Sequence, residues 1–588
     1  MKKIALLLAL ASLTTLTQAQ DTFVETPDHR LPVAQEWQSV HGSIRAAWGS
    51  SDVRYAWHSL PDVQRLHRHE QLTAWRGERV SAMALIYGDV ATDSVAPLTL
   101  QLSSFKSGRH TLPTQAVQAA FVRYVKTDAW STPDGRGAGC GHRPNHTIFD
   151  STMVADIIDP HAASLPLDAM STRSVWVSCQ VPTDAVPGTY SGHLTIKAGK
   201  RNVAKLPLNI KVIDRTLPAP KDWAFHLDLW QNPYSVARYY NVEPFSEEHF
   251  ELMRPIMKRY ADAGGKVITT SIMHKPWNGQ TYDPFESMVT WMKKADGTWW
   301  FDYTVFDKWV EFMMSCGVKK EINCYSMVPW RLSFQYFDQA SNQFKFFNGR
   351  PGDAAYEEFW MRMLQSFAQH LKEKGWFNIT HIAMDERPLK DMLATIKVVY
   401  KADPDFKLSL AGTYHKELLE DLDDYCITLA EKFTPEEIAK RKAEGKVTTY
   451  YTCCTEPRPN TFTFSPLAEA EWLGWWASKI NVDGYLRWAL NSWVKDPLLD
   501  TRFTAWAAGD CYLLYPGGRS SARFERLIEG IQAYEKIRIL RAEKDKRGRS
   551  KNYGKQIDKI LEPFNEFNLQ EVPAAKVVNQ AKAALNKF

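Results

Sequence analysis

Two adjacent acids, Asp385 and Glu386, are the residues of this chain whose placement most needs a chemical explanation. They follow the apolar run Ile382-Ala383-Met384 in the stretch NITHIAMDERP, residues 378–388. Neighbouring residues of a strand point to opposite faces, so a strand that continued through both acids would bury one carboxylate without a partner, which is costly. Either the strand stops here and both acids lie at an open end, or it exits into an ordinary loop where the charges are solvated.

Seven other short apolar runs also end in residues suited to binding or proton transfer. Run by run, these are Asp228, Trp230 and Gln231; His274 and Trp277; Asn323, Tyr325 and Trp330; Tyr414 and His415; Glu431; Tyr451 and Glu456; and Trp488, Asn491 and Trp493. A carbohydrate hydrolase needs such a set, because carboxyl groups transfer protons and stabilise charge while aromatic rings bind sugar faces. No Ser-His-Asp order, P-loop or clustered His/Cys ligands accompany them, so neither a cofactor nor a metal is predicted.

Each of these residues also has a structural explanation when it is taken alone. An acid after a strand is usually a helix cap or a solvated loop charge, and a histidine or tryptophan is often part of a core. Asp228 is as consistent with a hydrogen-bonded structural role as with ligand binding. The Asp385-Glu386 pair is the stronger candidate, because a loop cap does not explain two acids at the end of one buried strand.

The apolar runs alternate with helical segments in the middle of the chain. The runs are 223–230, 266–273, 319–328, the run that ends at Met384, 407–414, 425–430, 446–454 and 484–490. Strands that alternate with helices indicate parallel βαβ units, and eight of them within about 270 residues predict a (β/α)₈ barrel over residues 218–503. An open doubly wound sheet is the alternative, but it favours a Gly-rich loop after its first strand, and LDLWQNPYS has none. In a barrel, the residues at the strand ends above would share the active face.

The segments on either side of the barrel have different patterns. Residues 21–217 contain alternating apolar positions such as Val175, Val177 and Cys179, separated by turn clusters such as VPTDAVPG. Short strands with regular Pro/Gly turns predict a β-sandwich. Residues 504–588 contain a strand-like run and helices, and we expect this C-terminal extension to pack on the barrel.

The first twenty residues, MKKIALLLALASLTTLTQAQ, have the pattern of a secretory signal peptide, which predicts export to the periplasm or beyond the cell. No other segment resembles a transmembrane stretch. The formal charge is +5, or +3 without Lys2 and Lys3, which does not favour a nucleic-acid partner. The composition includes 22 Trp and 23 Tyr, which is consistent with a sugar ligand. Sequence alone leaves open the oligomeric state and whether Cys140 and Cys179 form a disulfide.

Three stretches resemble glycoside hydrolase family 123. They are HIAMDERP on the fourth predicted strand, VPTDAVPGTYSGHLTI in the predicted sandwich, and AWAAGDCYLLYPGGRSSARFERLIEGIQAYEKIRIL near the C-terminus. Members of that family are exo-acting β-N-acetylgalactosaminidases with a sandwich, a barrel and a short C-terminal part. The resemblance covers most of the chain after the leader and implies a glycan or glycolipid substrate with a terminal 2-acetamido sugar.

The resemblance also implies a mechanism and residue roles. The family's acid/base glutamate matches Glu386, and its preceding aspartate, which holds the substrate's 2-acetamido group, matches Asp385. The acetamido oxygen attacks the anomeric carbon and configuration is retained through an oxazoline-type intermediate. We expect Trp230, Asp228, His274, Asn323, Tyr414, Tyr451, Trp488 and Trp493 to bind the substrate.

Two alternatives remain open on sequence alone. One is an ordinary retaining β-glycosidase in which Glu386 is the acid/base and Glu456 is a covalent nucleophile, with carboxyl groups ~5–5.5 Å apart. The other is a sugar-binding protein without catalysis. The aglycone and the preference between GalNAc and GlcNAc cannot be predicted from these residues.

Overall fold

The computed structural model describes residues 22–93, 95–137, 139–141, 143, 146–544 and 553–588. These residues form two compact units. One comprises the chain up to Ala219 together with Pro457–Lys479 and Asp496–Phe588, and the other comprises Pro220–Glu456 and Ile480–Lys495. The predicted signal peptide, residues 1–20, lies outside the described residues. Among the described residues, no helix has the length and apolar content that crossing a bilayer requires.

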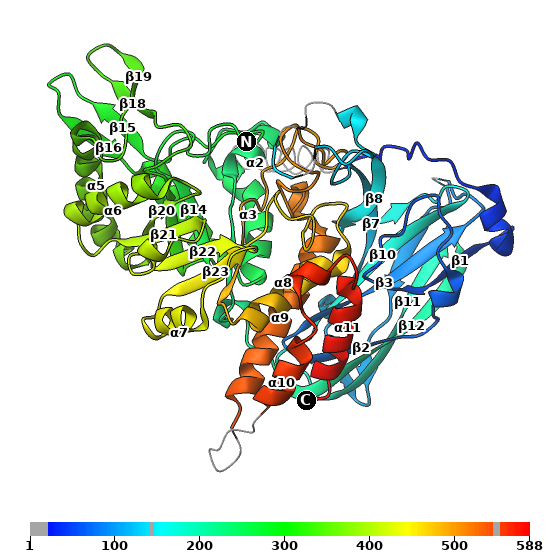
Figure 1. Cartoon of the computed structure of the whole chain (residues 1–588). Coiled ribbons are helices and arrows are strands. Elements are labelled where there is room, and N and C mark those ends of the chain that lie inside the picture. Colours follow the sequence, from blue (N-terminus) through cyan, green and yellow to red (C-terminus); the bar gives the residue numbers. More distant parts are fainter. Residues whose placement is uncertain (1–21, 94, 138, 142, 144–145, 545–552) are drawn as a thin grey trace, which may run out of the picture. The chain divides into compact units, whose positions relative to one another are not determined.

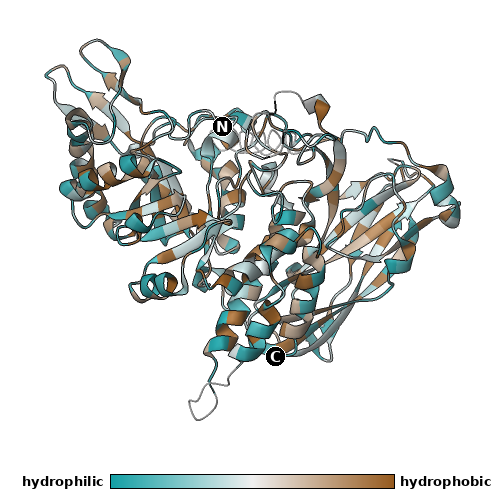
Figure 2. Cartoon of the chain, viewed as in Figure 1, coloured by the Kyte–Doolittle hydropathy of each residue, from teal (hydrophilic) through white to brown (hydrophobic). Residues whose placement is uncertain are grey.

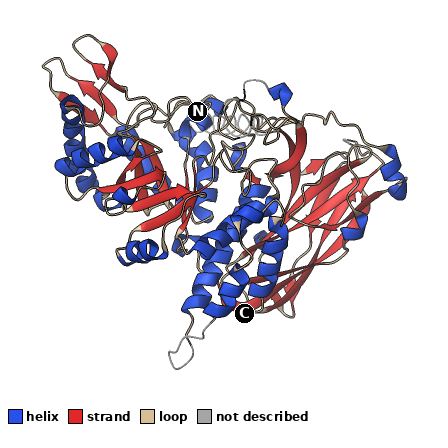
Figure 3. Cartoon of the chain, viewed as in Figure 1, coloured by secondary structure: helices blue, strands red, loops and turns tan. Residues whose placement is uncertain are grey.

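The first unit contains the predicted sandwich of two sheets, drawn as red arrows in Figure 3. The first sheet consists, in spatial order, of β1 (Ile44–Gly49), β3 (Arg79–Gly88), β10 (Ser171–Gln180), β7 (Val117–Thr127), β8 (Thr152–Asp159) and β25 (Ser520–Ser521). The main path of the second consists of β2 (Glu70–Arg76), β12 (Arg201–Thr216), β11 (Gly188–Ala198), β4 (Leu98–Leu102) and β9 (Ser164–Leu165). The alternating residues Val175, Val177 and Cys179 lie in one buried core with Leu194 and Ile196, which confirms the predicted sandwich.

The second unit is built on an eight-stranded parallel sheet that curls into a nearly closed barrel (Figure 1). In spatial order the strands are β13 (His226–Leu229), β24 (Gly484–Arg487), β23 (Val447–Tyr451), β22 (Asp424–Thr428), β21 (Lys407–Gly412), β20 (Thr380–Met384), β17 (Glu321–Tyr325) and β14 (Val267–Ser271). Every ladder between neighbours is parallel. This order confirms the predicted (β/α)₈ barrel, and each strand falls within or slightly overlaps one predicted run.

The barrel is completed by side chains where β13 meets β14, because a regular ladder is missing there. A single bridge joins Leu227 to Gly265. The Tyr260 hydroxyl donates to the carbonyls of Leu227 and Val267, 3.0 and 3.1 Å away. The Gln231 carboxamide accepts from the Thr269 N–H at 2.9 Å and donates to the Val267 carbonyl at 3.1 Å. These two side chains satisfy backbone groups that an open sheet edge would leave unpaired.

The helices around the barrel begin where the sequence places capping residues. Helix α3 (Glu247–Asp262) has Ser246 as its N-cap, and α7 (Pro435–Ala443) has a capping box between Thr434 and Glu437. The remaining barrel helices are α2 (Pro233–Tyr240), α4 (Thr304–Cys316), α5 (Ala354–Lys374) and α6 (Leu389–Ala402). In Figure 2, α7 is largely teal, as its sequence PEEIAKRKA requires of a helix with one solvated face.

A second small sheet is inserted into the barrel sequence and was not predicted. It consists, in spatial order, of β16 (Trp299–Asp302), β15 (Thr290–Lys293), β18 (Phe334–Asp338) and β19 (Gln343–Phe347). Its strands come from the two connections that follow β14 and β17. Trp291 and Phe359 of helix α5 stack with ring centroids 4.9 Å apart, so aromatic contacts fix this sheet on the outside of the barrel (Figure 1).

The C-terminal residues belong to the compact unit of the sandwich. They include α9 (Ala522–Ala542), α10 (Gly554–Leu561) and α11 (Ala574–Leu585), and β25 pairs with β8. Helix α8 (Leu467–Ile480) crosses α9 so closely that a Cβ on Gly474 would lie 2.1 Å from the Gly530 carbonyl oxygen. The structure groups residues 504–588 with the sandwich, and their packing on the barrel stays a prediction. Cys179 is a buried free thiol, so it forms no disulfide with Cys140.

Candidate active site

The Asp385-Glu386 pair lies at the carboxyl end of β20, which stops at Met384. Asp385 is partly buried and Glu386 is exposed, so neither carboxylate is forced into the sheet. His381, Ala383 and Asp385 are two residues apart, which places them on one side of the strand, and Ala383 lies in the apolar cluster inside the barrel. Asp385 therefore continues the inward face of β20, and Glu386 follows it in the loop.

Each carboxylate is held by an aromatic hydrogen-bond donor from a neighbouring segment. The Trp330 indole N–H donates to Asp385 Oδ2 at 2.9 Å, and the backbone N–H of Glu386 donates to Asp385 Oδ1 at 2.8 Å. The Tyr451 hydroxyl, at the end of β23, donates to Glu386 Oε1. Trp330 precedes the two acids in the sequence and Tyr451 follows them, and each holds one carboxyl group in place. Acid catalysis requires carboxyl groups that are positioned in advance in this way.

Burial and the negative charge of Glu386 together raise the pKa of Asp385 to about 6, against the lowering effect of the Trp330 hydrogen bond. Two carboxylates this close resist simultaneous ionisation. Burial also raises the pKa of the Tyr451 hydroxyl, and the adjacent Glu386 charge adds to this effect. Tyr451 therefore stays protonated and keeps its proton for the hydrogen bond to Glu386.

Three aromatic side chains form a floor beside the acids. The ring centroids of Trp230 and Tyr325 are 4.7 Å apart, those of Trp230 and Trp277 are 4.9 Å apart, and those of Trp277 and Tyr325 are 4.9 Å apart. All three follow or end barrel strands and share one apolar cluster with Tyr451 and Ala383. A half-buried carboxyl pair beside such a floor can transfer a proton to a ligand whose apolar face lies against the rings.

The predicted substrate-binding residues lie in several different environments. Trp230 and Tyr451 lie in the apolar cluster beside the acids, and the half-buried Trp488 packs against the same cluster. His274 lies in the loop after β14, where its Nδ1 is 2.5 Å from the carboxylate of Glu286. This hydrogen bond lowers the pKa of Glu286. These positions are compatible with a site at this end of the barrel.

Other predicted residues lie deeper or are held elsewhere. Asp228 and Asn323 are buried inside the barrel, and burial together with the charge of Asp424 raises the pKa of Asp228 well above its ordinary range. The Tyr414 hydroxyl donates to Glu437 of helix α7 at 2.7 Å. Trp493 is fully buried, with its ring 5.4 Å from that of Tyr239. Tyr414 and Trp493 thus have structural contacts, and substrate binding by any of these four residues stays a prediction.

Glu456, the candidate nucleophile of the alternative mechanism, is mostly buried in the loop after β23. Its Oε2 accepts the backbone N–H of Cys453 at 2.8 Å. Burial raises its pKa, against the lowering effect of that hydrogen bond. A nucleophile has to be ionised and accessible, and this environment favours neither.

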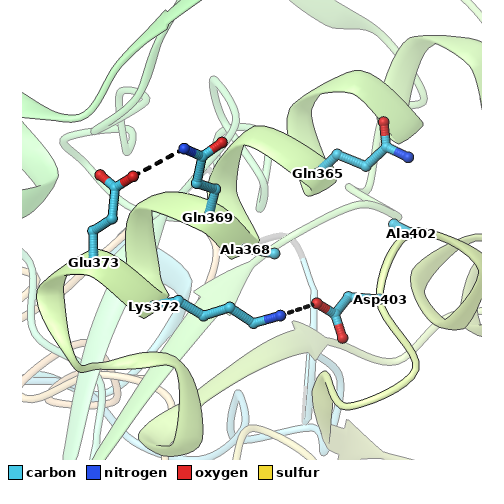
Figure 4. Close-up of a pocket in the computed structure, with 7 residues that line it drawn as sticks. All are labelled: Gln365, Ala368, Gln369, Lys372, Glu373, Ala402 and Asp403. Carbon is cyan, nitrogen blue, oxygen red and sulfur yellow. Dashed lines mark hydrogen bonds and ion pairs between the residues drawn. The ribbon is translucent and has the colours of Figure 1, made fainter.

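A separate surface pocket lies on the outer helices, between the C-terminal half of α5 and the end of α6 (Figure 4). Its polar side chains already bind one another: Lys372 pairs with Asp403, and Gln369 donates to Glu373 at 2.9 Å. Its lining contains no aromatic residue. This pocket has neither the acids nor the rings of the strand ends.

The predicted binding set did not include Trp330, Trp277, Tyr325 or Glu286. The first three stand at strand ends in the sequence, but nothing there shows which of many aromatics face the acids. Trp330 donates to Asp385 from a position 55 residues earlier. Glu286 lies in a long connection without a regular pattern, so its pairing with His274 leaves no signal in the sequence.

Comparisons with known proteins agree with this architecture. Residues 230–540 match the model of the glycoside hydrolase 123 catalytic domain, and residues 48–198 match that of the glycoside hydrolase 123 N-terminal domain. Among curated proteins, no sequence matches the chain significantly.

Two solved structures illustrate the range of structural similarity. A family 123 glycoside hydrolase from Clostridium perfringens, described in connection with glycolipid glycan hydrolysis, is 27% identical. It covers 93% of this chain and 99% of its own, with a TM-score of 0.82. A GH5 xyloglucanase from Bacteroides ovatus is 9% identical and covers 79% of this chain and 98% of its own, with a TM-score of 0.29. The catalytic-domain match spans more than half of the sequence, and the chain belongs to glycoside hydrolase family 123.

Proposed function

We propose that this glycoside hydrolase releases terminal β-linked N-acetylgalactosamine by a retaining mechanism in which the substrate's own 2-acetamido group is the nucleophile. The observation that carries the proposal is the pair of adjacent carboxyl groups at the end of β20, each held by its own aromatic donor. A single strand end that presents one partly buried acid and one exposed acid suits two different tasks. One acid orients the acetamide, and the other exchanges a proton with the glycosidic oxygen.

In the first step, the acetamido oxygen forms a bond to the anomeric carbon as the glycosidic C–O bond breaks. Glu386 gives its proton to the leaving oxygen, and Asp385 accepts a hydrogen bond from the acetamide N–H, which becomes more acidic as its oxygen attacks. That contact strengthens in the transition state, which is where binding raises kcat. In the second step, Glu386 takes a proton from water, and the water oxygen opens the oxazoline ring at the anomeric carbon with net retention.

The aromatic floor supports the same assignment. Trp230, Trp277 and Tyr325 are buried in one apolar cluster, and the half-buried Trp488 packs against it; a partly exposed aromatic ring binds the C–H side of a pyranose while polar groups bind its hydroxyls. The relative from Clostridium perfringens is described in connection with glycolipid glycans. We therefore infer a glycan or glycolipid substrate, and the leader sequence MKKIALLLALASLTTLTQAQ supports action in the periplasm or outside the cell.

The experiment compares Asp385→Asn with the native enzyme on an aryl β-N-acetylgalactosaminide. We expect kcat to fall about 10²–10³-fold with little change in KM, because the lost charge acts chiefly on the transition state. Asp403→Asn, in the outer pocket of Figure 4, is the matched control and should keep native kinetics. A thiazoline mimic of the cyclised intermediate should bind tightly to the native enzyme and weakly to Asp385→Asn.

Two results would contradict the proposal. One is good turnover of a plain β-galactoside, which has a hydroxyl in place of the internal nucleophile. The other is a covalent glycosyl-enzyme on Glu456 trapped with a 2-fluoro sugar, which would establish the ordinary retaining mechanism instead. Absence of turnover on any aryl 2-acetamido glycoside would favour a sugar-binding protein without catalysis.

A further inference from the structure

A second group of ionisable side chains lies inside the barrel at the end opposite the acids. His226, Glu321 and Asp424 are the first residues of β13, β17 and β22, and His381 is the second residue of β20. Parallel strands begin at one end of a barrel and finish at the other, so these residues gather at the amino end, below the inward-facing Asp228 and Asn323. They take no part in the chemistry proposed for Asp385 and Glu386.

These four side chains are buried without enough hydrogen bonds to satisfy them. None is more than 5% exposed. Within the described residues, both ring nitrogens of His226, Nδ1 of His381, Oε1 of Glu321 and Oδ1 of Asp424 have no hydrogen-bond partner. Leaving even one buried polar atom unsatisfied costs about 1–3 kcal/mol, and more for a charged group. Several such atoms in one place indicate a missing common partner.

The spacing of the atoms fits a metal ion better than hydrogen bonds. His226 Nε2 lies 3.6 Å from Asp424 Oδ2, and His381 Nδ1 lies 3.5 Å from Glu321 Oε1. One ligand atom from each of His226, Glu321 and Asp424 lies within 4.8 Å of the others. Hydrogen bonds between such atoms are about 2.7–3.2 Å long. In a tetrahedral zinc site with bonds of about 2.0–2.2 Å, neighbouring ligand atoms are about 3.3–3.6 Å apart.

We propose that His226, Glu321 and Asp424 bind a divalent transition-metal cation, with zinc as the best fit, and that His381 supplies the fourth ligand. Two carboxylates and a divalent ion sum to zero charge, which removes the penalty of burying two acids together. Imidazole nitrogens with carboxylate oxygens suit zinc, whereas calcium and magnesium take six or more oxygen ligands. Lys320, which precedes Glu321, is exposed, and the buried Lys266 donates to the carbonyls of Pro220 and Lys221.

The ion would be structural rather than catalytic. Four protein ligands close a tetrahedral site and leave no position for water or substrate. The four ligands come from β13, β17, β20 and β22, so the ion would join the neighbouring pair β17 and β20 to two strands that lie elsewhere in the sheet. Buried ligands also imply that the ion enters as the barrel folds. A metal-free arrangement is the competing explanation, in which a proton shared by Glu321 and Asp424 replaces the cation.

The first test measures the metal content of the full-length protein, purified without a polyhistidine tag and without chelator. We expect about one equivalent of zinc per chain that survives dialysis at neutral pH. Asp424→Asn and His226→Gln should lose this metal and melt several degrees lower. His370→Gln is the matched control, because His370 pairs with Asp307 between outer helices at 2.7 Å, and it should keep the metal.

A second measurement keeps the proposal testable if those variants fail to fold. The native chain is unfolded in guanidinium and refolded with EDTA, with Zn²⁺ or with Co²⁺. Zn²⁺ should raise the yield and the melting temperature relative to EDTA, and Co²⁺ should give the visible absorption of a four-coordinate site. Protein that is isolated metal-free and refolds equally well in EDTA, without a cobalt spectrum, would overturn the proposal. Metal that remains in both ligand variants would overturn its location.

Discussion

Replacing Asp385 by Asn is expected to stabilise the folded protein at pH 8 even though it removes activity. Burial and the charge of Glu386 raise the pKa of Asp385 from its ordinary 3.8 to about 6. The folded state therefore holds this proton more tightly than the unfolded chain does. Below pH 3.8 this carboxyl is protonated in both states and does not reduce the free energy of unfolding. As the pH rises from 3.8 through about 6, the carboxyl ionises more easily in the unfolded state, so stability is lost.

The size of the effect follows from the shift. A rise from 3.8 to about 6 corresponds to at most about 3 kcal/mol at high pH. Asp385 is only partly buried, so solvent screens the charge and about 1–2 kcal/mol is the better expectation. Asparagine keeps the size of the side chain and an oxygen for the Trp330 N–H, so it removes the charge without opening a cavity. A gain of about 1–2 kcal/mol raises the melting temperature of a domain of this size by roughly 2–8 °C.

The assay is thermal unfolding of native protein and Asp385→Asn at pH 8 and at pH 5. The gain should be larger at pH 8, because at pH 5 most of the native Asp385 is already protonated and resembles asparagine. Asp403→Asn is a control for which the opposite change in stability is expected. Burial alone raises the pKa of Asp403, but hydrogen bonds from Lys372 and the Asp405 backbone lower it overall, so its loss should destabilise slightly at pH 8. A variant Asp385→Asn that melts below the native protein at pH 8, or whose gain is equal at both pH values, would refute the reasoning.

Four further substitutions test the site and its surroundings. Glu386→Gln should lower kcat about 10²–10⁴-fold, with a smaller loss on aryl glycosides that have good leaving groups; an equal loss on good and poor leaving groups would rule out the acid role. Tyr451→Phe should lower kcat/KM about 10–100-fold because it removes the hydrogen bond that holds the Glu386 carboxyl group, and an unchanged kcat/KM would show that the bond to Glu386 has no part in turnover. Trp493→Ala should cost about 3–5 kcal/mol in unfolding free energy, since the side chain is fully buried against Tyr239, whereas Trp488→Ala at a half-buried position should cost less; denaturant titration of both variants measures the difference.

The strands of the barrel were predictable because their signal is local. Each predicted run is apolar, short and bounded by caps such as Ser246 or Thr434, and every parallel strand was found within or beside its run. The four-stranded insert was missed for a physical reason. Most positions of β15, β16 and β18 are only partly buried, QFKFF at β19 is largely exposed, and all four strands lie in connections whose length suggests loops. Register and pairing there depend on contacts such as Trp291 on Phe359, which no periodicity records.

The candidate site was only partly predictable. Strand ends locate the acids and many aromatics, because parallel strands deliver their last residues to one face. Strand ends do not reveal how deeply each side chain is buried. Asp228 and Trp493 satisfy the same positional rule as the half-buried Trp488, yet both are buried. The donors to the acids are Trp330, in the loop after β17, and Tyr451, at the end of β23, and their pairing with the acids is identified only once the chain is folded.

The inward-facing residues of β20, the fourth barrel strand, explain why an acid with a raised pKa is retained beside a well-packed core. Its inward positions His381, Ala383 and Asp385 change from a fully buried imidazole, through a small apolar residue, to a partly solvated carboxyl. The middle position matters, because a side chain larger than alanine would compete for space with Tyr325 and Trp230 in the same cluster. The close packing around Ala383 resists the relaxation by which Asp385 would otherwise move into water. The energy stored in its raised pKa is therefore held by the barrel core, and a carboxyl kept in that state gains most when a substrate amide supplies the missing hydrogen bond.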